Sequence, residues 1–157
     1  MPVFEFVYLT PAPEFRGTLT ADGPIIPVEV SMPSALEEWC VKNSVAIPAP
    51  IAGYALVDTG ASISAIHEEI LTQLSIVPID SIPMSTPSGS DRAFVYPTRV
   101  SFPALNVQGY ALSRVAGSQL GWDTSDGKKI IMLLGRDLLS QFLLVYNGHT
   151  NTVTLAF

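Results

Sequence analysis

The sequence predicts a single, mainly-β domain with two or three short helices. Thirteen prolines and eleven glycines among 157 residues favour many turns between short strands. Hydrophobic residues make up 48% of the chain and charged residues only 14%, so we expect a folded core and no intrinsic disorder. A chain of this length fits one ordinary domain but not two.

The first third of the chain is expected to form three strands and one helix. The strands are Val3–Leu9, Phe15–Thr20 and Ile25–Val30, the last two on either side of the turn Ala21-Asp22-Gly23-Pro24. A helix is predicted for Ala35–Lys42, because Ser34 and Glu37 have the spacing of a capping box. The apolar face of this helix is formed by Leu36, Trp39 and Cys40. We therefore expect Cys40 to be a buried core thiol.

Shorter elements follow along the rest of the chain. The middle is predicted to hold a buried strand at Ile51–Val57, a helix at Ile66–Leu74, and strands at Ser81–Thr86 and Arg92–Val100 that flank Pro87–Ser90. The last third is predicted to hold a strand at Val107–Val115, an exposed loop at Gly117–Lys129, an apolar strand at Ile130–Leu134, a helix at Arg136–Gln141, and a closing hairpin of Phe142–Tyr146 and Thr152–Phe157.

The charge balance argues against two classes of partner. The net charge is −6 with no basic cluster, which disfavours binding to nucleic acid. No apolar stretch is long enough to cross a membrane, and no secretory signal is recognisable, so we expect no membrane partner. The single cysteine fits a reducing compartment, and we expect a cytoplasmic protein. A mean hydropathy of +0.37 indicates that another chain covers some apolar surface.

Most kinds of catalytic site lack their motif. The only histidines, His67 and His149, belong to no ligand cluster, and His67-Glu68-Glu69 is expected to lie on a solvated helix face. The nucleophile elbow Gly-x-Ser-x-Gly, the phosphate-binding loop and the dinucleotide fingerprint do not occur. We therefore expect neither a metal nor a cofactor.

The segment Asp58-Thr59-Gly60-Ala61-Ser62 combines a carboxylate with a sharp turn of small residues, directly after an apolar strand. Gly60 would let backbone N–H groups approach Asp58 and stabilise its ionised form. Each of these residue types is also common in ordinary turns, so an Asx-type turn remains an alternative at this point.

A second motif, Leu133-Leu134-Gly135-Arg136-Asp137-Leu138-Leu139, is a buried strand that ends in glycine and turns into a helix. Together with Ala55–Ser62, and with their order and separation, it resembles the retropepsin-like aspartic proteases, which are single-domain relatives of pepsin. The resemblance covers about Phe15–Phe157. It implies a pepsin/retropepsin-like closed β-barrel that is active as a two-fold dimer.

The resemblance implies a role for several residues. Asp58 matches the catalytic aspartate, Thr59 the threonine that locks two such loops together, and Gly60 the glycine that leaves room for substrate. Ala61 and Ser62 complete this loop. Gly135 matches the small residue packed behind the loop, and Arg136 the arginine that braces the dimer. The flap of the family matches Ser85, Thr86, Pro87, Ser88, Gly89 and Ser90. Thr154–Phe157 resembles the C-terminal strand with which retroviral members dimerise.

The sequence also departs from the family. Ser62 replaces a second acid that pairs with the arginine, so Arg136 must find another partner. Residues 33–50 are an insertion relative to the compact viral enzymes, and loop 117–129 is longer than its counterpart. Trp122 in that loop either lines a subsite or packs locally. Residues 1–13 form a strand or arm, and the protease domain spans residues 14–157. We expect no catalytic role for Asp137 at the helix start.

Aspartic protease chemistry needs two carboxylates that share a proton, and this chain has one Asp-Thr-Gly. We therefore expect a homodimer in which two copies of Asp58 activate a water that attacks an extended peptide. Apolar subsites are expected from residues such as Phe94, Val115 and Trp122. Two alternatives are a dimeric or peptide-binding module without proteolytic activity, and a plain β-barrel domain in which Asp58 caps a turn.

Overall fold

The computed structural model describes residues 3–7, 19–86, 89–121 and 123–156. Its strands are β1 (Val3–Val7), β2 (Ile25–Ser31), β3 (Ile51–Val57), β4 (Ala65–His67), β5 (Asp80–Thr86), β6 (Gly89–Phe102), β7 (Val107–Ser118), β8 (Ile130–Leu134), β9 (Leu143–Asn147) and β10 (Thr152–Ala156). Its helices are α1 (Leu19–Asp22), α2 (Ser34–Lys42), α3 (Glu68–Gln73), α4 (Arg136–Leu139) and the 3-10 turn Pro103–Leu105. The prediction of a mainly-β chain with short helices is confirmed.

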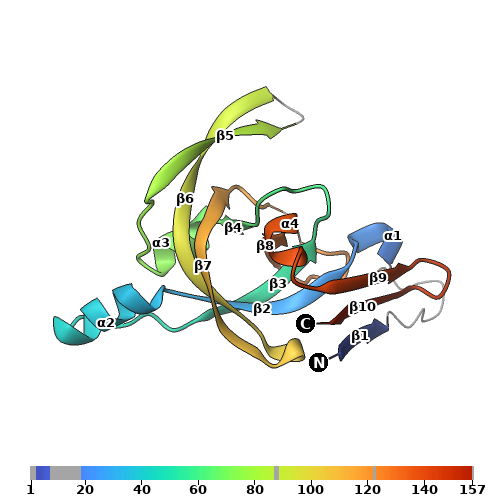
Figure 1. Cartoon of the computed structure of the whole chain (residues 1–157), viewed down its shortest axis with the longest axis horizontal. Coiled ribbons are helices and arrows are strands. Elements are labelled where there is room, and N and C mark those ends of the chain that lie inside the picture. Colours follow the sequence, from blue (N-terminus) through green and yellow to red (C-terminus); the bar gives the residue numbers. More distant parts are fainter. Residues whose placement is uncertain (1–2, 8–18, 87–88, 122, 157) are drawn as a thin grey trace.

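Six strands close into a barrel. The large sheet has the order β2-β3-β8-β4-β7-β6-β5, and an additional pairing between β2 and β6 closes the ring (Figure 1). The wholly apolar β8 lies in the middle of this sheet, parallel to β3 and antiparallel to β4. Strand β3 was expected to be buried, but it alternates, with Ala55 and Val57 facing inward, because its other face is outside the barrel wall.

The barrel interior is one continuous apolar core. Its fully buried side chains come from all six barrel strands, from α3 and from the residue that follows α3, and they include Val30, Ala55, Ile66, Leu71, Leu74, Val100, Phe102, Val115, Met132 and Leu134. The ring of Phe102 packs edge-on against Phe142, with the ring centres 6.2 Å apart. Phe142 leads into β9, so this contact joins the barrel to the strands at the end of the chain.

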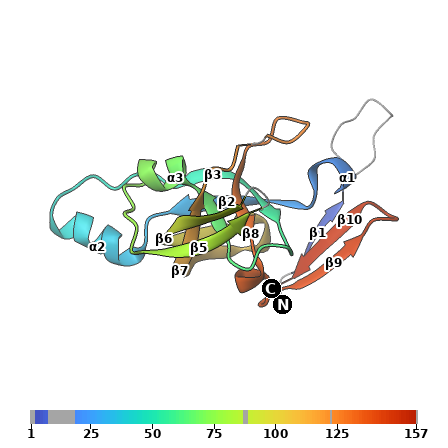
Figure 2. The ribbon, with the colours of Figure 1, turned by 90° about the horizontal axis from the view of Figure 1, so that it is seen from above.

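A second sheet joins the two ends of the chain. Its order is β1-β10-β9, so β10 is paired on both sides, and Figure 2 shows this sheet beside the barrel. The predicted N-terminal strand is confirmed for Val3–Val7, and so is the closing hairpin. The strand predicted at Phe15–Thr20 is wrong at its end: Leu19 is buried, begins the helical turn α1, and its carbonyl accepts from Gly23 N–H. Residues 15–18 lie outside the described residues.

Helix α2 extends from the barrel (Figure 2) and is held by one arginine. Arg99 on β6 donates to Met32 O (2.9 Å) and to the Ser34 hydroxyl (3.2 Å), and it forms an ion pair with Glu37. These contacts explain why the predicted capping box is wrong. Its Ser and Glu side chains bind Arg99, and Pro33 is the N-cap.

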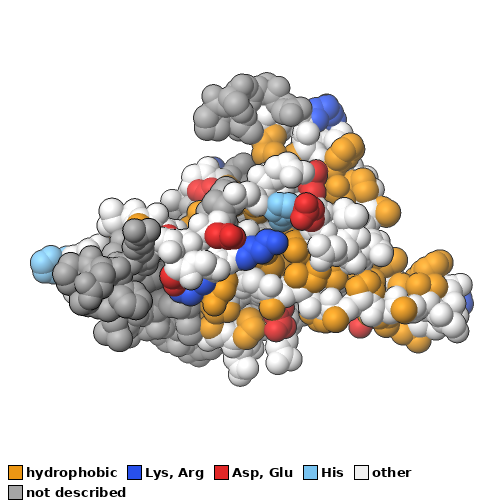
Figure 3. Space-filling view, turned by 180° about the vertical axis from the view of Figure 1, so that it is seen from behind, with side chains coloured by type: hydrophobic (Ala, Val, Ile, Leu, Met, Phe, Trp, Pro, Cys, Tyr) orange, Lys and Arg blue, Asp and Glu red, His pale blue; other side chains and the backbone are white. Residues whose placement is uncertain are grey.

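The outer surface of α2 is unexpectedly apolar. The helix contacts the barrel through Leu36 and the buried Cys40, as predicted, but Trp39 is turned outward and is 54% exposed. Val41, Val45 and Ile47 are exposed beside it, and Figure 3 shows apolar side chains at this end of the molecule. Only Leu36 and Cys40 of this helix pack against the core, so its other apolar side chains remain exposed to solvent.

Two other segments differ in detail from the prediction. The helix predicted at Ile66–Leu74 divides into β4 and α3, although its apolar residues are buried as expected. None of the helices in the described part of the chain is long and apolar enough to span a membrane.

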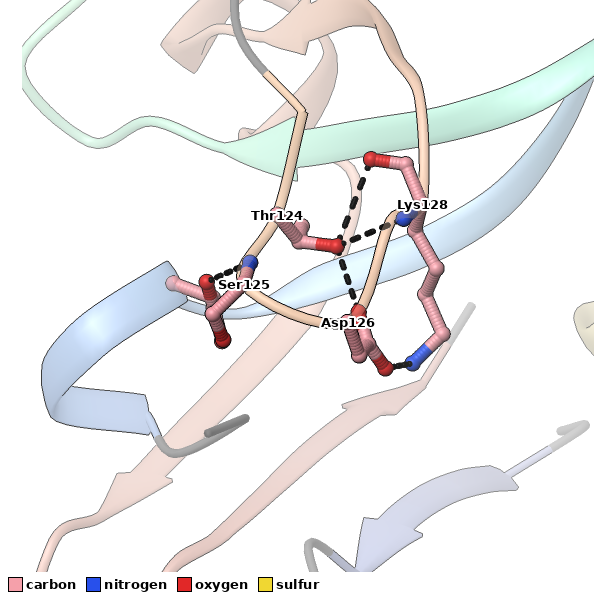
Figure 4. Close-up of polar contacts among 5 residues, drawn as sticks. Thr124, Ser125, Asp126 and Lys128 are labelled. Atoms are coloured by element: carbon pink, nitrogen blue, oxygen red, sulfur yellow. Dashed lines mark hydrogen bonds and ion pairs between the residues drawn. The ribbon is translucent and has the colours of Figure 1, made fainter. Parts of the chain in front are cut away.

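The segment Gly117–Lys129, predicted to be an exposed loop, is partly buried and forms hydrogen bonds with the rest of the protein. Its first two residues belong to β7. Thr124 is buried, donates to Asp126 and accepts from Lys128 N–H, while Ser125 donates twice to Asp22 of α1 at 2.8 Å (Figure 4). The ion pair with Lys128, and then the bond from Thr124, lower the pKa of Asp126. These contacts tie the loop to α1.

We expect Leu134→Ala to destabilise the fold strongly, because this side chain is fully buried at the end of β8. The loss should be about 2–5 kcal/mol in the free energy of unfolding. Urea titration at one fixed protein concentration measures it. Val77→Ala, at a side chain that is 70% exposed, should change the free energy by less than about 0.5 kcal/mol. Equal losses in both variants would contradict the assignment of the core.

Candidate active site

Asp58 lies where two parallel strands end together. Strands β3 and β8 run side by side to Val57 and Leu134, and Asp58 N–H donates to the carbonyl of Leu134 at 3.0 Å. The chain after β3 then forms a loop, residues 58–64, which we call the aspartate loop. The chain after β8 turns into α4. Because the two strands are parallel, both turns emerge at the same edge of the sheet.

The carboxylate of Asp58 is held by its own loop. Its Oδ1 accepts from Gly60 N–H at 2.8 Å and from Ala61 N–H at 3.2 Å, while Oδ2 accepts no hydrogen bond from the described residues. A Cβ at position 60 would lie 3.0 Å from Oδ1, so glycine gives the carboxylate the room it occupies. The partly buried carboxylate thus has one fixed oxygen and one oxygen available to another group.

Arg136, the first residue of α4, binds the backbone of the aspartate loop. Its guanidinium donates from Nη1 to Thr59 O (2.7 Å) and Gly60 O (3.0 Å). Its backbone N–H donates to Ala61 O at 3.0 Å. Three successive loop carbonyls therefore accept from one residue. This is the partner that Arg136 was expected to need in place of an acid at position 62.

A buried serine makes the second connection between the loop and α4. Ser64 is fully buried, and its hydroxyl donates to Asp137 Oδ1 (2.7 Å) and accepts from Gly135 N–H (3.0 Å). Its backbone N–H lies 3.0 Å from both oxygens of Asp137. Ser64 was not among the site residues predicted from the sequence, and Asp137 was expected only to be favourable at a helix start. A serine among apolar residues two positions beyond the turn was the one available signal.

Gly135 lies directly behind the aspartate loop. A Cβ at this position would lie 2.7 Å from the carbonyl carbon of Ile63 and 2.8 Å from Ser64 N. Both are backbone atoms, which cannot rotate away as a side chain can. The backbone of Gly135 is in the extended region that any residue adopts, so only space demands glycine here. The position matches the expectation of a small residue behind the loop.

The expected flap is a long hairpin of β5 and β6. The strands pair as far as Ser85 with Ser90 and Thr86 with Gly89, while Pro87 and Ser88 lie outside the described residues. In Figure 1 the hairpin rises from the barrel and curves toward the side of α4. Strand β6 continues from the hairpin into the barrel wall, and its pairing with β7 shifts register beside Pro97.

One ion pair lies at the base of this hairpin. Arg114 on β7 donates to Asp80 at the start of β5, at 2.9 Å. The hydrogen bond from this guanidinium lowers the pKa of Asp80. Both side chains are about half exposed, so the pair contributes little to stability.

The expected subsite residues lie in different environments. Phe94 is 54% exposed on the hairpin, whereas Val115 is fully buried in the core and is not accessible to a ligand. Trp122 lies outside the described residues. A surface pocket borders the aspartate loop at Ser62 and Ile63, and its other walls come from β7 and α4. Asp58 does not line it.

The histidine predicted on a solvated helix face has a structural contact. His67 is the N-cap of α3, and its Nδ1 accepts from Glu69 N–H. Within the described ranges, no three or more His, Cys, Asp and Glu side chains are grouped so that they could hold a metal ion.

Residues 51–138, which contain both the aspartate loop and the start of α4, match the family model described as "Aspartyl protease". This chain belongs to the aspartyl protease family. The membership predicted from Ala55–Ser62 and Leu133–Leu139 is confirmed, and the predicted closed β-barrel is present. No curated protein sequence matches the chain.

Two solved structures of proteases from viruses are similar to this aspartyl protease. The simian foamy virus (mac) protease is 20% identical, with a TM-score of 0.39, and the match covers 73% of this chain and 91% of that one. The EIAV protease complexed with the inhibitor HBY-793 is 17% identical, with a TM-score of 0.44, and the match covers 85% and 93%.

We expect Gly135→Ala to destabilise this aspartyl protease by about 1–3 kcal/mol, because the added methyl group overlaps the backbone of the aspartate loop. Urea unfolding measures the loss. Gly121→Ala is the matched control, since a Cβ there meets nothing within 4 Å. A loss as large for the control as for Gly135→Ala would contradict the close packing behind the loop.

Proposed function

We propose that this chain is an aspartic endopeptidase that hydrolyses peptide bonds with a water activated by two copies of Asp58 across a homodimer. The observation that carries the proposal is the carboxylate of Asp58, with one oxygen fixed by backbone N–H groups and the other available. It lies in a loop that two separate residues of α4 hold in place. Membership of the aspartyl protease family supports the same reaction.

The reaction requires a second carboxylate, and the chain supplies one Asp-Thr-Gly. A two-fold axis beside the aspartate loop would bring the second copy of Asp58 to the available oxygen of the first. Two carboxyl groups so close together cannot both ionise readily, so they would share one proton.

Each carboxyl group of the pair then has its own task. The ionised Asp58 takes a proton from the water, whose oxygen attacks the peptide carbonyl carbon. The protonated Asp58 donates to the carbonyl oxygen, where negative charge develops. When the tetrahedral intermediate collapses, the C–N bond breaks, the leaving nitrogen receives the proton that the first Asp58 took from the water, and a hydroxyl proton of the intermediate returns to the second Asp58. No metal or cofactor is needed for these steps.

The remaining predicted residues position this pair. Gly60 leaves room for Asp58, and Arg136 would hold the loop in place through its hydrogen bonds to the carbonyls of Thr59, Gly60 and Ala61. The role proposed for Thr59 is to bind the partner's loop. The hairpin of β5 and β6 would cover an extended peptide and add strand-like hydrogen bonds to it. A dimeric module that binds peptides without cutting them is the alternative outcome of the tests below.

We expect Asp58→Asn to abolish cleavage while the protein stays folded and dimeric, because an amide cannot accept the proton of the water. The loss of kcat should be at least about 1,000-fold, as expected when a general base and its partner are removed together. A diverse peptide mixture, digested from pH 3 to pH 8 and analysed by mass spectrometry, measures it.

The matched control is Glu38→Gln, an exposed carboxylate on α2 outside the aspartate loop, which should leave the cleavage products unchanged. Equal cleavage by the Asp58→Asn variant and the unaltered protein would contradict the proposed chemistry. Absence of cleavage by the unaltered dimer at every pH would favour the peptide-binding alternative.

We also expect specific activity to fall on dilution, because a lone chain holds half of the active pair. Initial rates across a range of enzyme concentrations, compared with the dimer fraction from sedimentation, measure the effect. Activity per chain should follow the dimer fraction. A constant activity per chain in samples that sediment as monomers would contradict the shared site.

A further inference from the structure

Strand β9 is an open edge at the end of the second sheet. It pairs with β10 along Leu143–Asn147, and no other strand of the described residues pairs with its opposite side. The side chains of Leu143, Val145 and Tyr146 are about half exposed there. Soluble proteins usually protect such edges with charged residues, prolines or bulges, because unpaired N–H and C=O groups invite another strand. The sequence Leu-Leu-Val-Tyr-Asn contains none of these protections.

The charge distribution singles out the same region. The chain carries a net charge of −6, so two copies repel each other over most of their surfaces. After Asp137, however, residues 138–157 contain no Asp, Glu, Lys or Arg. The β9–β10 hairpin is therefore where two copies can approach without opposing like charges.

Strand β10 is not available for the same purpose. Both of its neighbours, β1 and β9, come from its own chain. The sequence analysis expected the terminal residues Thr154–Phe157 to correspond to a dimerisation strand. In this structure a partner could pair with β10 only after displacing β1 or β9, whereas no strand of the described residues pairs with the other side of β9.

The open edge also lies close to the aspartate loop. Helix α4 contacts the loop through Arg136 and Asp137 and ends at Leu139, and β9 begins at Leu143. In Figure 1, β9 is the strand of the second sheet that follows directly from α4. A two-fold axis that passes near Asp58 can therefore pass near β9 as well.

We propose that two copies of this chain dock by pairing their β9 strands edge to edge, which gives a six-stranded sheet in the order β1-β10-β9 and then β9-β10-β1 of the second copy. This inference rests on the homodimer of the proposed function and names the surface that forms it. Each terminal strand stays with its own chain. Full overlap of the five residues in an antiparallel pair about a two-fold axis places Val145 opposite its own copy, and Leu143 opposite Asn147.

The test introduces a charge at the centre of this pair. In the Asp58→Asn protein, which avoids self-digestion, Val145→Glu places two carboxylates opposite each other across the axis. We expect the dimer dissociation constant to rise about 100-fold or more, because directly opposed like charges cost several kcal/mol. Sedimentation equilibrium measures it without reference to activity. Val41→Glu is the matched control, since Val41 is 67% exposed on α2 and lies outside the proposed surface.

A cysteine variant tests the register independently of folding stability. Opposed residues of an antiparallel pair have Cα atoms about 4.5–5.5 Å apart, within the range of a disulfide. Val145→Cys should therefore form a disulfide-linked dimer under mild oxidation. Thr154→Cys should not, because three strand spacings, about 14 Å, would separate the two copies. The native thiol of Cys40 is buried, so the parent protein gives the baseline.

A Val145→Glu monomer, a Val41→Glu dimer and cross-linking through Val145→Cys alone would support the inference. A dimer that persists unchanged in Val145→Glu, or cross-linking through Thr154→Cys alone, would overturn it. An Asp58→Asn protein that is monomeric at every concentration would overturn both this surface and the shared active site. A β9-paired dimer whose unaltered form cleaves no peptide would support the surface and contradict the proteolytic function.

Discussion

The hydroxyl of Ser64 joins two segments that are 73 residues apart in the chain, the aspartate loop and the start of α4. It donates to Asp137 and accepts from Gly135, and Ser64 itself is fully buried. A buried hydroxyl without partners would be costly, so the loop and the helix are stable only together. The position of Asp58 follows from this constraint, because the loop that carries it has Ser64 at one end and the β3–β8 pairing at the other.

The sequence predicted those features correctly that depend on residues close together in the chain. Asp58 and Gly60 were singled out because the segment Asp58–Ser62 and the Gly135-Arg136 motif together resemble a known family, whereas the turn alone also fitted an ordinary Asx-type turn. The β8 strand could be identified because all five of its residues are apolar. The strand pattern was likewise enough for a mainly-β fold. Ser64 could not be assigned in this way, since its role depends on a glycine and an aspartate that are distant in sequence.

Other errors have the same origin in tertiary contacts. Ser34 and Glu37 have the spacing of a capping box, but Arg99 from β6 binds both side chains and the helix begins without them. The sequence pattern places Trp39 on the same helical face as Cys40, but only Leu36 and Cys40 pack against the barrel core. Ser125 resembles a loop residue, and its partner Asp22 becomes evident only when α1 is placed beside the loop. Local sequence patterns thus predicted most helices and strands, while contacts between distant residues determined where these elements end and which of their faces are exposed.

The hairpin and the barrel wall share the 14-residue strand β6, and this has a mechanical consequence. The hairpin is continuous with the barrel through β6, so we expect any movement of the hairpin to bend this strand, whose other end is paired in the barrel wall. Bending concentrates where the backbone ladder is weakest, and the register shift beside Pro97 interrupts the ladder just after the last residue that pairs with β5. Proline supplies no N–H there, so the ladder lacks a possible hydrogen bond at this position. We therefore expect β6 to bend most readily near residue 97, between the part that pairs with β5 and the part that lies in the barrel wall.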